Sequence, residues 1–412
     1  MQSAIRNPQS AIPISGLGLL TPLGHSPYQT WQALCAGRCI TDRCVNLPDD
    51  IDPVALVQSV GHIAVARHTS DDPAVELAER AARQAITEAG IGGGRDSLKR
   101  VTPMVLACSK GAMHSASCTM PLGPVSYLVE RLRRRLNIGP VRQVVAACAS
   151  SLIGLHLARQ WLLHENVKRV LVVTTEAALV PMFIHSYRRL GVLPRLTVDD
   201  YRGYPLDERR NGFVLTEVAA AMMLELQPSR EPLAYLTDTA VASEADDIMR
   251  LSPDRPALRH VAQRLFAGHP SGGGPIDLLH PHATGTLDND ASELAAYADA
   301  LAVGGWRFAL EDPAMHNHPN RKPQTANRQL FPDVYACKGA LGHGLGSAGL
   351  TAAVLAVLCA KTQTRPPMPW LSEPIQTPLR LAIEPDGRAI RRQALFAAGF
   401  GGHVAGAVIQ AP

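Results

Sequence analysis

The stretch VVAACASS at residues 144–151 runs directly into LIGLHLARQWLL at residues 152–163. The first run has the apolar composition of a strand and the second has that of a helix, so the sequence predicts a strand-to-helix turn at Cys148. Free amides and the positive end of a helix dipole favour a thiolate there, which makes Cys148 a candidate nucleophile. Taken alone, a cysteine among alanines and valines is more often a small buried hydrophobic residue.

The rest of the chain alternates short β-branched runs with alanine-rich segments of helical period, which predicts layered α/β structure. We expect strands at residues 170–174, 219–224, 276–279, 334–336, 394–400 and 404–409. One helix should run from Ala74 to Ala89, capped by Asp72 and ended by Gly90. A second should begin near Asp290, with Glu293 completing a capping box. Both are interpreted as scaffold helices.

Three of these strands lead into segments rich in glycine and in reactive side chains. The segments are HATGT at residues 282–286, KGALGHGLGSAG at residues 338–349 and GFGG at residues 399–402. Ligands of layered α/β proteins gather where strands end and loops meet. The order of these segments therefore predicts one composite site.

Together with Cys148, and in this order, the segments resemble the β-ketoacyl synthases of the thiolase superfamily over almost the whole chain. ISGLGLLTPLG at residues 14–24, TEA at 175–177 and PLDERRNGFV at 205–214 also match that family. The resemblance implies an α/β, thiolase-like fold, in which two duplicated halves form a layered αβαβα arrangement. Residues 1–247 would carry the nucleophile, and residues 248–412 would carry two histidines and a lysine.

The resemblance also implies the catalytic roles. Cys148 matches the nucleophile, His282 and His343 match the paired histidines, and Lys338 matches the supporting lysine. A thiolate would take an acyl group from a thioester, and two neutral imidazoles would then stabilise the enolate formed when a malonyl donor loses carbon dioxide. The implied reaction is a decarboxylative Claisen condensation in fatty-acid, polyketide or specialised lipid synthesis.

Three further residues receive roles by the same resemblance. Thr284 and Thr286 would hold the phosphopantetheine arm, and Phe400 would be the gating aromatic residue, whose backbone amide joins that of Cys148 in an oxyanion hole. The family pattern departs at Ala283, where glycine is usual. It also departs at Ala352, where the elongating enzymes carry glutamate.

The implied partners are an acyl carrier protein and its acyl and malonyl thioesters, with no cofactor beyond the carrier's phosphopantetheine and no metal. A homodimer is expected, and a heterodimer is an alternative. Two other readings stay open: a non-condensing partner subunit like a chain-length factor, and an initiating synthase or acyl hydrolase using Cys148. The run RLRRRL at residues 131–136 could dock an acidic carrier or form a solvated helix face.

Composition narrows the class of protein further. A formal net charge of +4 over 412 residues lacks the basic excess typical of nucleic-acid binding. The eight cysteines form no disulfide or zinc framework, which favours reduced thiols and a cytoplasmic location. The longest apolar stretch, residues 349–360, is shorter than the roughly 20 residues of a membrane span. The polar stretch at residues 315–328 is expected to be an exposed loop.

Overall fold

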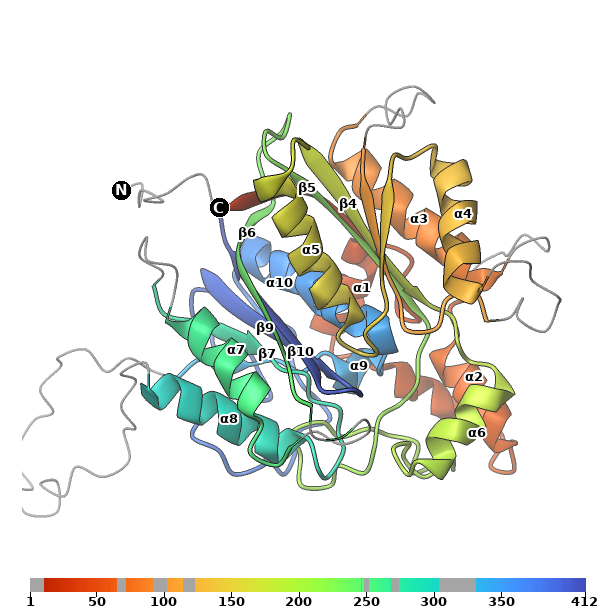
Figure 1. The fold of residues 1–412 in the computed structure, drawn as a ribbon. Helices are drawn as coiled ribbons and strands as arrows, with labels where there is room; N and C mark the ends of the chain where they lie inside the picture. Colours follow the sequence, from red (N-terminus) through yellow and green to blue (C-terminus); the bar gives the residue numbers. More distant parts are fainter. Residues whose placement is uncertain are drawn as a thin grey trace, which may run out of the picture.

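The computed structural model describes residues 11–64, 72–91, 102–113, 123–245, 247, 252–267, 274–303 and 331–412. The polar stretch at residues 315–328 lies outside them. The described residues form one ten-stranded sheet in the order β3-β2-β4-β5-β1-β6-β10-β9-β7-β8 (Figure 1). Its first five strands are β1 Ile12–Leu20, β2 Met104–Ala107, β3 Val141–Val144, β4 Arg169–Glu176 and β5 Val218–Glu225. The other five are β6 Ala234–Ser243, β7 Leu278–His280, β8 Asp333–Val334, β9 Arg392–Gly399 and β10 His403–Gln410.

The strand order shows that the fold is duplicated. In the first half β2 pairs in parallel with β3 and β4, whereas β5 pairs antiparallel with β4 and β1. In the second half β7 pairs in parallel with β8 and β9, whereas β10 pairs antiparallel with β9 and β6. A short ladder between β1 and β6 joins the halves. The boundary at residue 247 stays a prediction, although the strand order itself divides between β5 and β6.

Helices fill three layers around these strands (Figure 1). Helix α3 (Pro73–Glu88) packs on β1, β4 and β5, and α4 (Pro124–Leu136) packs on α3. On the second half, α7 (Pro256–Phe266) packs on β6 and β10, with α8 (Asp290–Val303) against it. Between the halves, α5 (Ser150–His164) and α10 (Ala348–Thr362) contact each other and strands of both. This is the predicted layered αβαβα arrangement.

The remaining helices are short: α1 Pro27–Cys35, α2 Pro53–Gly61, α6 Pro181–Arg189 and α9 Lys338–Leu341, with 3₁₀ segments at Ile40–Asn46 and Leu345–Ser347. Helices α2 and α6 contact each other. They belong to a separate apolar cluster, which includes Tyr187 of α6 and buried loop residues such as Phe213.

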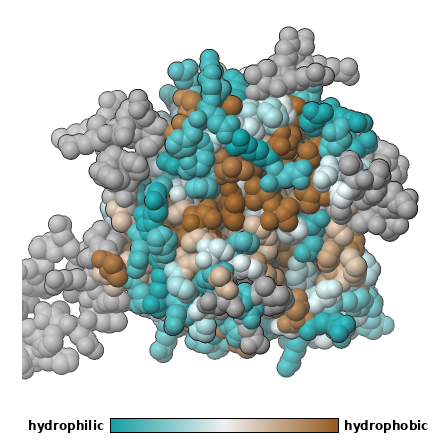
Figure 2. All heavy atoms as spheres, viewed as in Figure 1, coloured by the Kyte–Doolittle hydropathy of each residue, from teal (hydrophilic) through white to brown (hydrophobic). Residues whose placement is uncertain are grey.

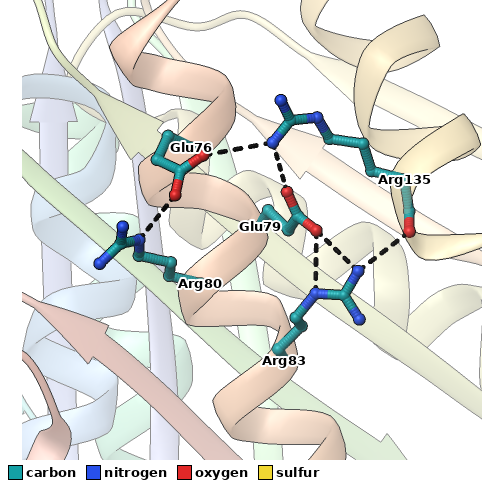
Figure 3. A pocket seen from close by; sticks show the side chains of 5 residues that line it. All are labelled: Glu76, Glu79, Arg80, Arg83 and Arg135. Atoms are coloured by element: carbon teal, nitrogen blue, oxygen red, sulfur yellow. Dashed lines mark hydrogen bonds and ion pairs between the residues drawn. The ribbon is translucent and has the colours of Figure 1, made fainter. Parts of the chain in front are cut away.

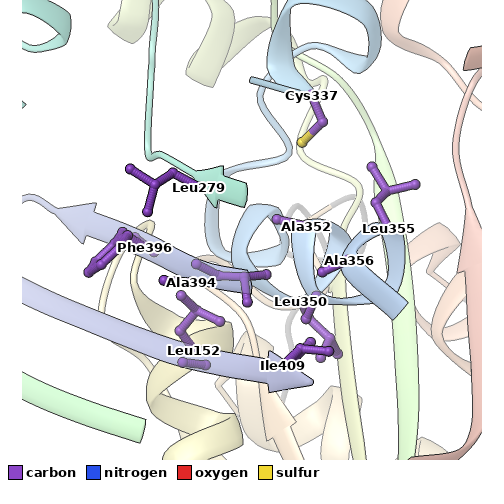
Figure 4. Close-up of a cluster of buried hydrophobic side chains, with 14 of the residues drawn as sticks. Leu152, Leu279, Cys337, Leu350, Ala352, Leu355, Ala356, Ala394, Phe396 and Ile409 are labelled. Atoms are coloured by element: carbon purple, nitrogen blue, oxygen red, sulfur yellow. The ribbon is translucent and has the colours of Figure 1, made fainter. Parts of the chain in front are cut away.

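Helix α10 is the centre of the hydrophobic core. Every side chain from Ala348 to Ala360 is buried, and the cluster around it includes Leu152 of α5 and Phe396 of β9 (Figure 4). Within the described residues, Leu345–Thr362 is long and apolar enough to cross a membrane, but 89% of this stretch is buried inside the protein. Its apolar character is that of a core helix. Ala352, at the position where the family carries glutamate, is part of this cluster.

Most predicted elements are confirmed, with shifts of a few residues. Helix α3 begins at Pro73, and the Asp72 carboxylate accepts a hydrogen bond of 2.9 Å from the Ala74 amide. The strands expected at residues 276–279 and 334–336 are present as the shorter β7 and β8. Helix α8 begins at Asp290 as expected, but the predicted capping box is wrong, because the carboxylates of Asp290 and Glu293 bind a neighbouring loop instead.

The arginine-rich run at residues 131–136 lies on α4. Arg133 and Arg134 pair with Glu130 on the same helix. Arg135 bridges Glu76 and Glu79 of α3, at 3.2 and 2.5 Å (Figure 3). These ion pairs occupy three of the four arginines of the run, so the geometry favours a solvated, helix-joining face over a carrier-docking site.

Candidate active site

Cys148 lies in a tight turn between β3 and α5, as the sequence predicts. Ala147 has a φ of +46°, in the left-handed region that costs a non-glycine residue roughly 1 kcal/mol. The Ser150 hydroxyl holds the turn, because it accepts from the Ala146 amide at 2.9 Å and donates to the Ala147 carbonyl at 2.6 Å. The turn therefore presents the largely buried Cys148 thiol ahead of the helix.

His282 follows β7, in a loop fastened from α8. The Glu293 carboxylate accepts from the amides of His282 and Ala283, at 2.5 and 2.7 Å. The Asp290 carboxylate accepts from the Gly285 amide at 3.0 Å. Asp290 and Glu293, which were predicted only to begin a scaffold helix, thus fix the loop that carries His282.

His343 follows α9 and is fixed by the backbone and by one aromatic ring. Its amide donates to the Val214 carbonyl at 2.7 Å. Its imidazole meets the Phe213 ring edge to face, with centroids 4.9 Å apart. The Lys338 amine donates to the carbonyl of His282, so Lys338 ties the two histidine loops together.

The three predicted reactive side chains come together from both halves of the fold. One ring nitrogen of His282, one of His343 and the Cys148 sulfur all lie within 4.8 Å of one another. The imidazole rings are 5.4 Å apart at 79°. Burial, reinforced by the charge of Lys338, holds the pKa of each histidine well below its usual range. Both imidazoles are therefore neutral near pH 7 and can donate or accept a hydrogen bond.

The expectation of a stabilised Cys148 thiolate is wrong for the resting protein. Burial raises the pKa of this thiol to about 11, against the opposing charge of Lys338. Helix α5 begins only at Ser150, so Cys148 precedes its first turn, and loss of solvation dominates. A base must therefore take the thiol proton during acyl transfer, and the neutral imidazoles lie close enough to do so.

The glycine-rich turn after β9 packs directly on the nucleophile turn. A Cβ added to Gly399 would lie 3.0 Å from the Cys148 nitrogen and 3.1 Å from the Ala146 oxygen, so a larger residue here would push the two backbone segments apart. Phe400 follows, with its side chain 37% exposed. The predicted gating residue is thus beside Cys148.

Thr284 and Thr286 lie on the His282 loop, and their hydroxyls are 2.8 Å apart. Thr284 is buried and Thr286 is partly exposed, while Leu287 beside them is 65% exposed. The loop therefore leads from the buried histidine to the surface. Ala283 takes a φ of +36° at the position where the family carries glycine.

Glu176, for which no role was predicted from the sequence, ends β4 at the end of the sheet where β3 leads into Cys148. One of its carboxylate oxygens accepts from the Ser109 amide, and burial raises the pKa of this carboxyl to about 7. Its other oxygen, Oε2, has no hydrogen-bond partner among the described residues. The available signal was a carboxylate at the end of a buried strand rich in β-branched residues.

A thiol and two neutral imidazoles, joined across a duplicated α/β fold, define a cysteine-dependent acyl-transferring enzyme. Residues 9–229 match the family described as "Beta-ketoacyl synthase, N-terminal domain", and residues 233–310 match "Beta-ketoacyl synthase, C-terminal domain". The chain therefore belongs to the β-ketoacyl synthase family and is an acyltransferase of the condensing type, as the sequence predicted.

Relatives and solved structures agree with this assignment. The chain is 24% identical over 392 residues to 3-oxoacyl-[acyl-carrier-protein] synthase 2 of Coxiella burnetii, covering 88% of each protein. It is 22% identical to the tetracenomycin polyketide synthase ketoacyl synthase alpha subunit of Streptomyces glaucescens, covering 90% of this chain and 89% of that one. The ketosynthase of AntDE:AntF, a type II PKS acyl-carrier protein in complex with its ketosynthase, matches with a TM-score of 0.76 and 17% identity, over 98% of this chain and 99% of that one. At that identity the structural match supports the thiolase-like fold.

Proposed function

We propose that this chain joins an acyl group held on Cys148 to a malonyl-type unit on an acyl carrier protein. The observation that carries the proposal is the cluster of the Cys148 sulfur with His282 and His343, within 4.8 Å. The first step is acyl transfer. The Cys148 sulfur attacks the thioester carbonyl, an imidazole takes the thiol proton, and the carrier thiolate leaves and recovers that proton.

The second step is decarboxylative condensation. The carbon–carbon bond to the malonyl carboxylate breaks, carbon dioxide leaves, and the electron pair forms an enolate of the carrier thioester. His282 and His343, both neutral, donate hydrogen bonds to the enolate oxygen. The enolate carbon then attacks the acyl-Cys148 carbonyl, and the Cys148 thiolate leaves and is reprotonated. The product is a 3-oxoacyl thioester two carbons longer than the acyl group.

The flanking residues serve these steps. The amides of Cys148 and Phe400 hold the negative oxygen of the tetrahedral intermediate. The close packing of Gly399 against the Cys148 amide supports this role, because it brings the two amides near each other. Lys338 holds the loops of His282 and His343 in position relative to each other, because its amine donates to the His282 carbonyl. Thr284 and Thr286 bind the phosphopantetheine arm along the loop that reaches the surface. No other cofactor and no metal takes part.

The carrier partner is supported by the AntDE:AntF complex, in which a related ketosynthase binds its acyl-carrier protein. The seven described cysteines are free thiols, which supports a reducing compartment, and we place the enzyme in the cytoplasm.

A dimer with a second copy of the chain forms through β3. This strand lies at the edge of the sheet. Val145 beside it is 57% exposed, and Ile153 and Leu157 of α5 are only partly buried. Figure 2 shows an apolar area on the face where α5 lies in Figure 1. Exposed edges and large apolar patches favour association. A Val145→Lys variant should be monomeric by light scattering, whereas an unchanged mass would contradict this interface.

The two alternative functions are tested by the product. A partner subunit like a chain-length factor would not acylate Cys148, and an acyl hydrolase would release free acid. The experiment combines acyl-carrier and malonyl-carrier substrates and measures the product by mass spectrometry. A 3-oxoacyl carrier thioester lengthened by two carbons supports condensation. Free acid, or no product despite a folded enzyme, would overturn it.

A further inference from the structure

A line of aromatic rings connects the site to a lysine outside the catalytic set. His343 packs on Phe213, and Phe213 packs edge to face on Tyr187 of α6, with centroids 5.9 Å apart. The Lys110 amine lies over the rings of Phe183 and Tyr187, at 5.1 and 5.8 Å from their centroids. Within the described residues, Lys110 has no ion-pair partner and the Tyr187 hydroxyl has no hydrogen bond.

A second set of contacts brings Glu176 to the same side of the nucleophile. Glu176 accepts from the amide of Ser109, the residue before Lys110. A Cβ added to Gly346 would lie 2.6 Å from the Glu176 carboxylate and 3.2 Å from the Ala147 oxygen, so a single backbone segment separates Glu176 from the nucleophile turn. The side chain is 1% exposed, and its Oε2 is unpaired among the described residues.

Lys110, Glu176 and Tyr187 form what we call the polar wall. The contacts place this wall near the reactive thiol: Tyr187 is joined to His343 through the Phe213 ring, and Gly346 lies against both Glu176 and the nucleophile turn. The charges of Lys110 and Glu176 accordingly act on the pKa of Cys148. An acyl group on Cys148 that extends toward α6 therefore meets the Lys110 amine, which has no ion-pair partner among the described residues, the Tyr187 hydroxyl and the unpaired Oε2 of Glu176.

We propose that the polar wall selects acyl groups that carry an oxygen near the thioester, such as 3-hydroxyacyl or 3-oxoacyl chains, over saturated alkyl chains. This inference rests on the proposed acylation of Cys148. A saturated chain against the wall removes water from the partly exposed Lys110 and leaves Glu176 Oε2 unpaired, which is unfavourable for buried polar groups. A hydroxyl or keto oxygen accepts from Lys110 or Tyr187, and a hydroxyl also donates to Glu176 Oε2.

The test is a competition for Cys148 between the N-acetylcysteamine thioesters of 3-hydroxybutyrate and butyrate, two acyl groups that differ by one oxygen. Intact-mass measurement gives the ratio of the adducts at early times. Preference for 3-hydroxybutyryl by about tenfold is expected, the equivalent of one hydrogen bond. Lys110→Met and Glu176→Gln should each bring the ratio toward one while butyryl loading persists.

Lys361→Met is the matched control. Lys361 also lies over a ring, 5.0 Å from the centroid of Tyr28, but it is exposed and lies outside the wall, so the ratio should stay at the wild-type value. Equal or faster loading of butyryl by the wild type would contradict the selectivity proposed for the polar wall. A preference for 3-hydroxybutyryl that persists in both Lys110→Met and Glu176→Gln would contradict it as well. If neither thioester acylates Cys148, the proposed function fails instead.

Discussion

The carboxylate of Glu293 accepts a hydrogen bond of 2.5 Å from the backbone amide of His282. The same carboxylate accepts from the amide of Ala283, the hydroxyl of Tyr297 and the side chain of Asn289. One buried acidic group of the α8 helix therefore fixes the position of a histidine in the reactive cluster.

Replacing Glu293 by glutamine should weaken both the fold and the reaction. The new amide would turn a donor toward backbone N–H groups that need an acceptor, at a cost of about 2 kcal/mol. Urea unfolding should show this loss, and kcat should fall more than the affinity for substrate changes. Glu165→Gln, which breaks only the exposed pair with Arg142, should change stability by less than about 1 kcal/mol. Equal effects of the two substitutions would contradict the role of Glu293.

Replacing Ala283 by glycine should stabilise the protein. Ala283 has a φ of +36°, and glycine removes the left-handed strain of roughly 1 kcal/mol. Thermal unfolding should therefore move to a higher temperature. The matched change Ala295→Gly, at an exposed position inside α8, should destabilise by about 1 kcal/mol. A lower unfolding temperature for Ala283→Gly would show that the loop is not strained.

Alkylation of Cys148 by iodoacetamide should speed up steadily with pH. A thiol whose pKa is raised to about 11 is protonated at neutral pH, and its thiolate fraction grows as pH rises toward that value. Peptide mass mapping separates Cys148 from the exposed Cys35. A plateau near pH 7 would mean that the start of α5 outweighs burial and that the resting thiol is already ionised.

Condensation should not depend on a bound metal. The cluster of Cys148, His282 and His343 has donor atoms that could also hold a metal ion, but the proposed reaction uses them as nucleophile and hydrogen-bond donors. Dialysis against EDTA should leave kcat unchanged, and added Zn²⁺ should inhibit. Activity lost on dialysis and restored by zinc would contradict a metal-free mechanism.

The sequence predicted that Cys148, His282 and His343 meet, because Cys148 and His282 each follow a short strand and the family motifs occur in order. The roles of Asp290 and Glu293 could not be predicted, since a capping-box pattern is local and does not reveal that the loop at residues 282–285 folds back onto α8. Glu176 and Lys110 became candidates only once β2 and β4 were seen as neighbours. The raised pKa of Cys148 likewise depends on burial, which local sequence does not specify.

In the proposed reaction, Cys148 carries the acyl group. The most direct test of this is intact-mass and peptide-mass measurement after mixing the enzyme with an acyl-carrier thioester, before and after malonyl-carrier protein is added. We expect one acyl group per chain on Cys148, lost as a 3-oxoacyl product when the malonyl donor arrives, and no acylation of Cys148→Ala. Acylation of the Cys148→Ala variant at the wild-type level, or an acyl group on another residue, would contradict it.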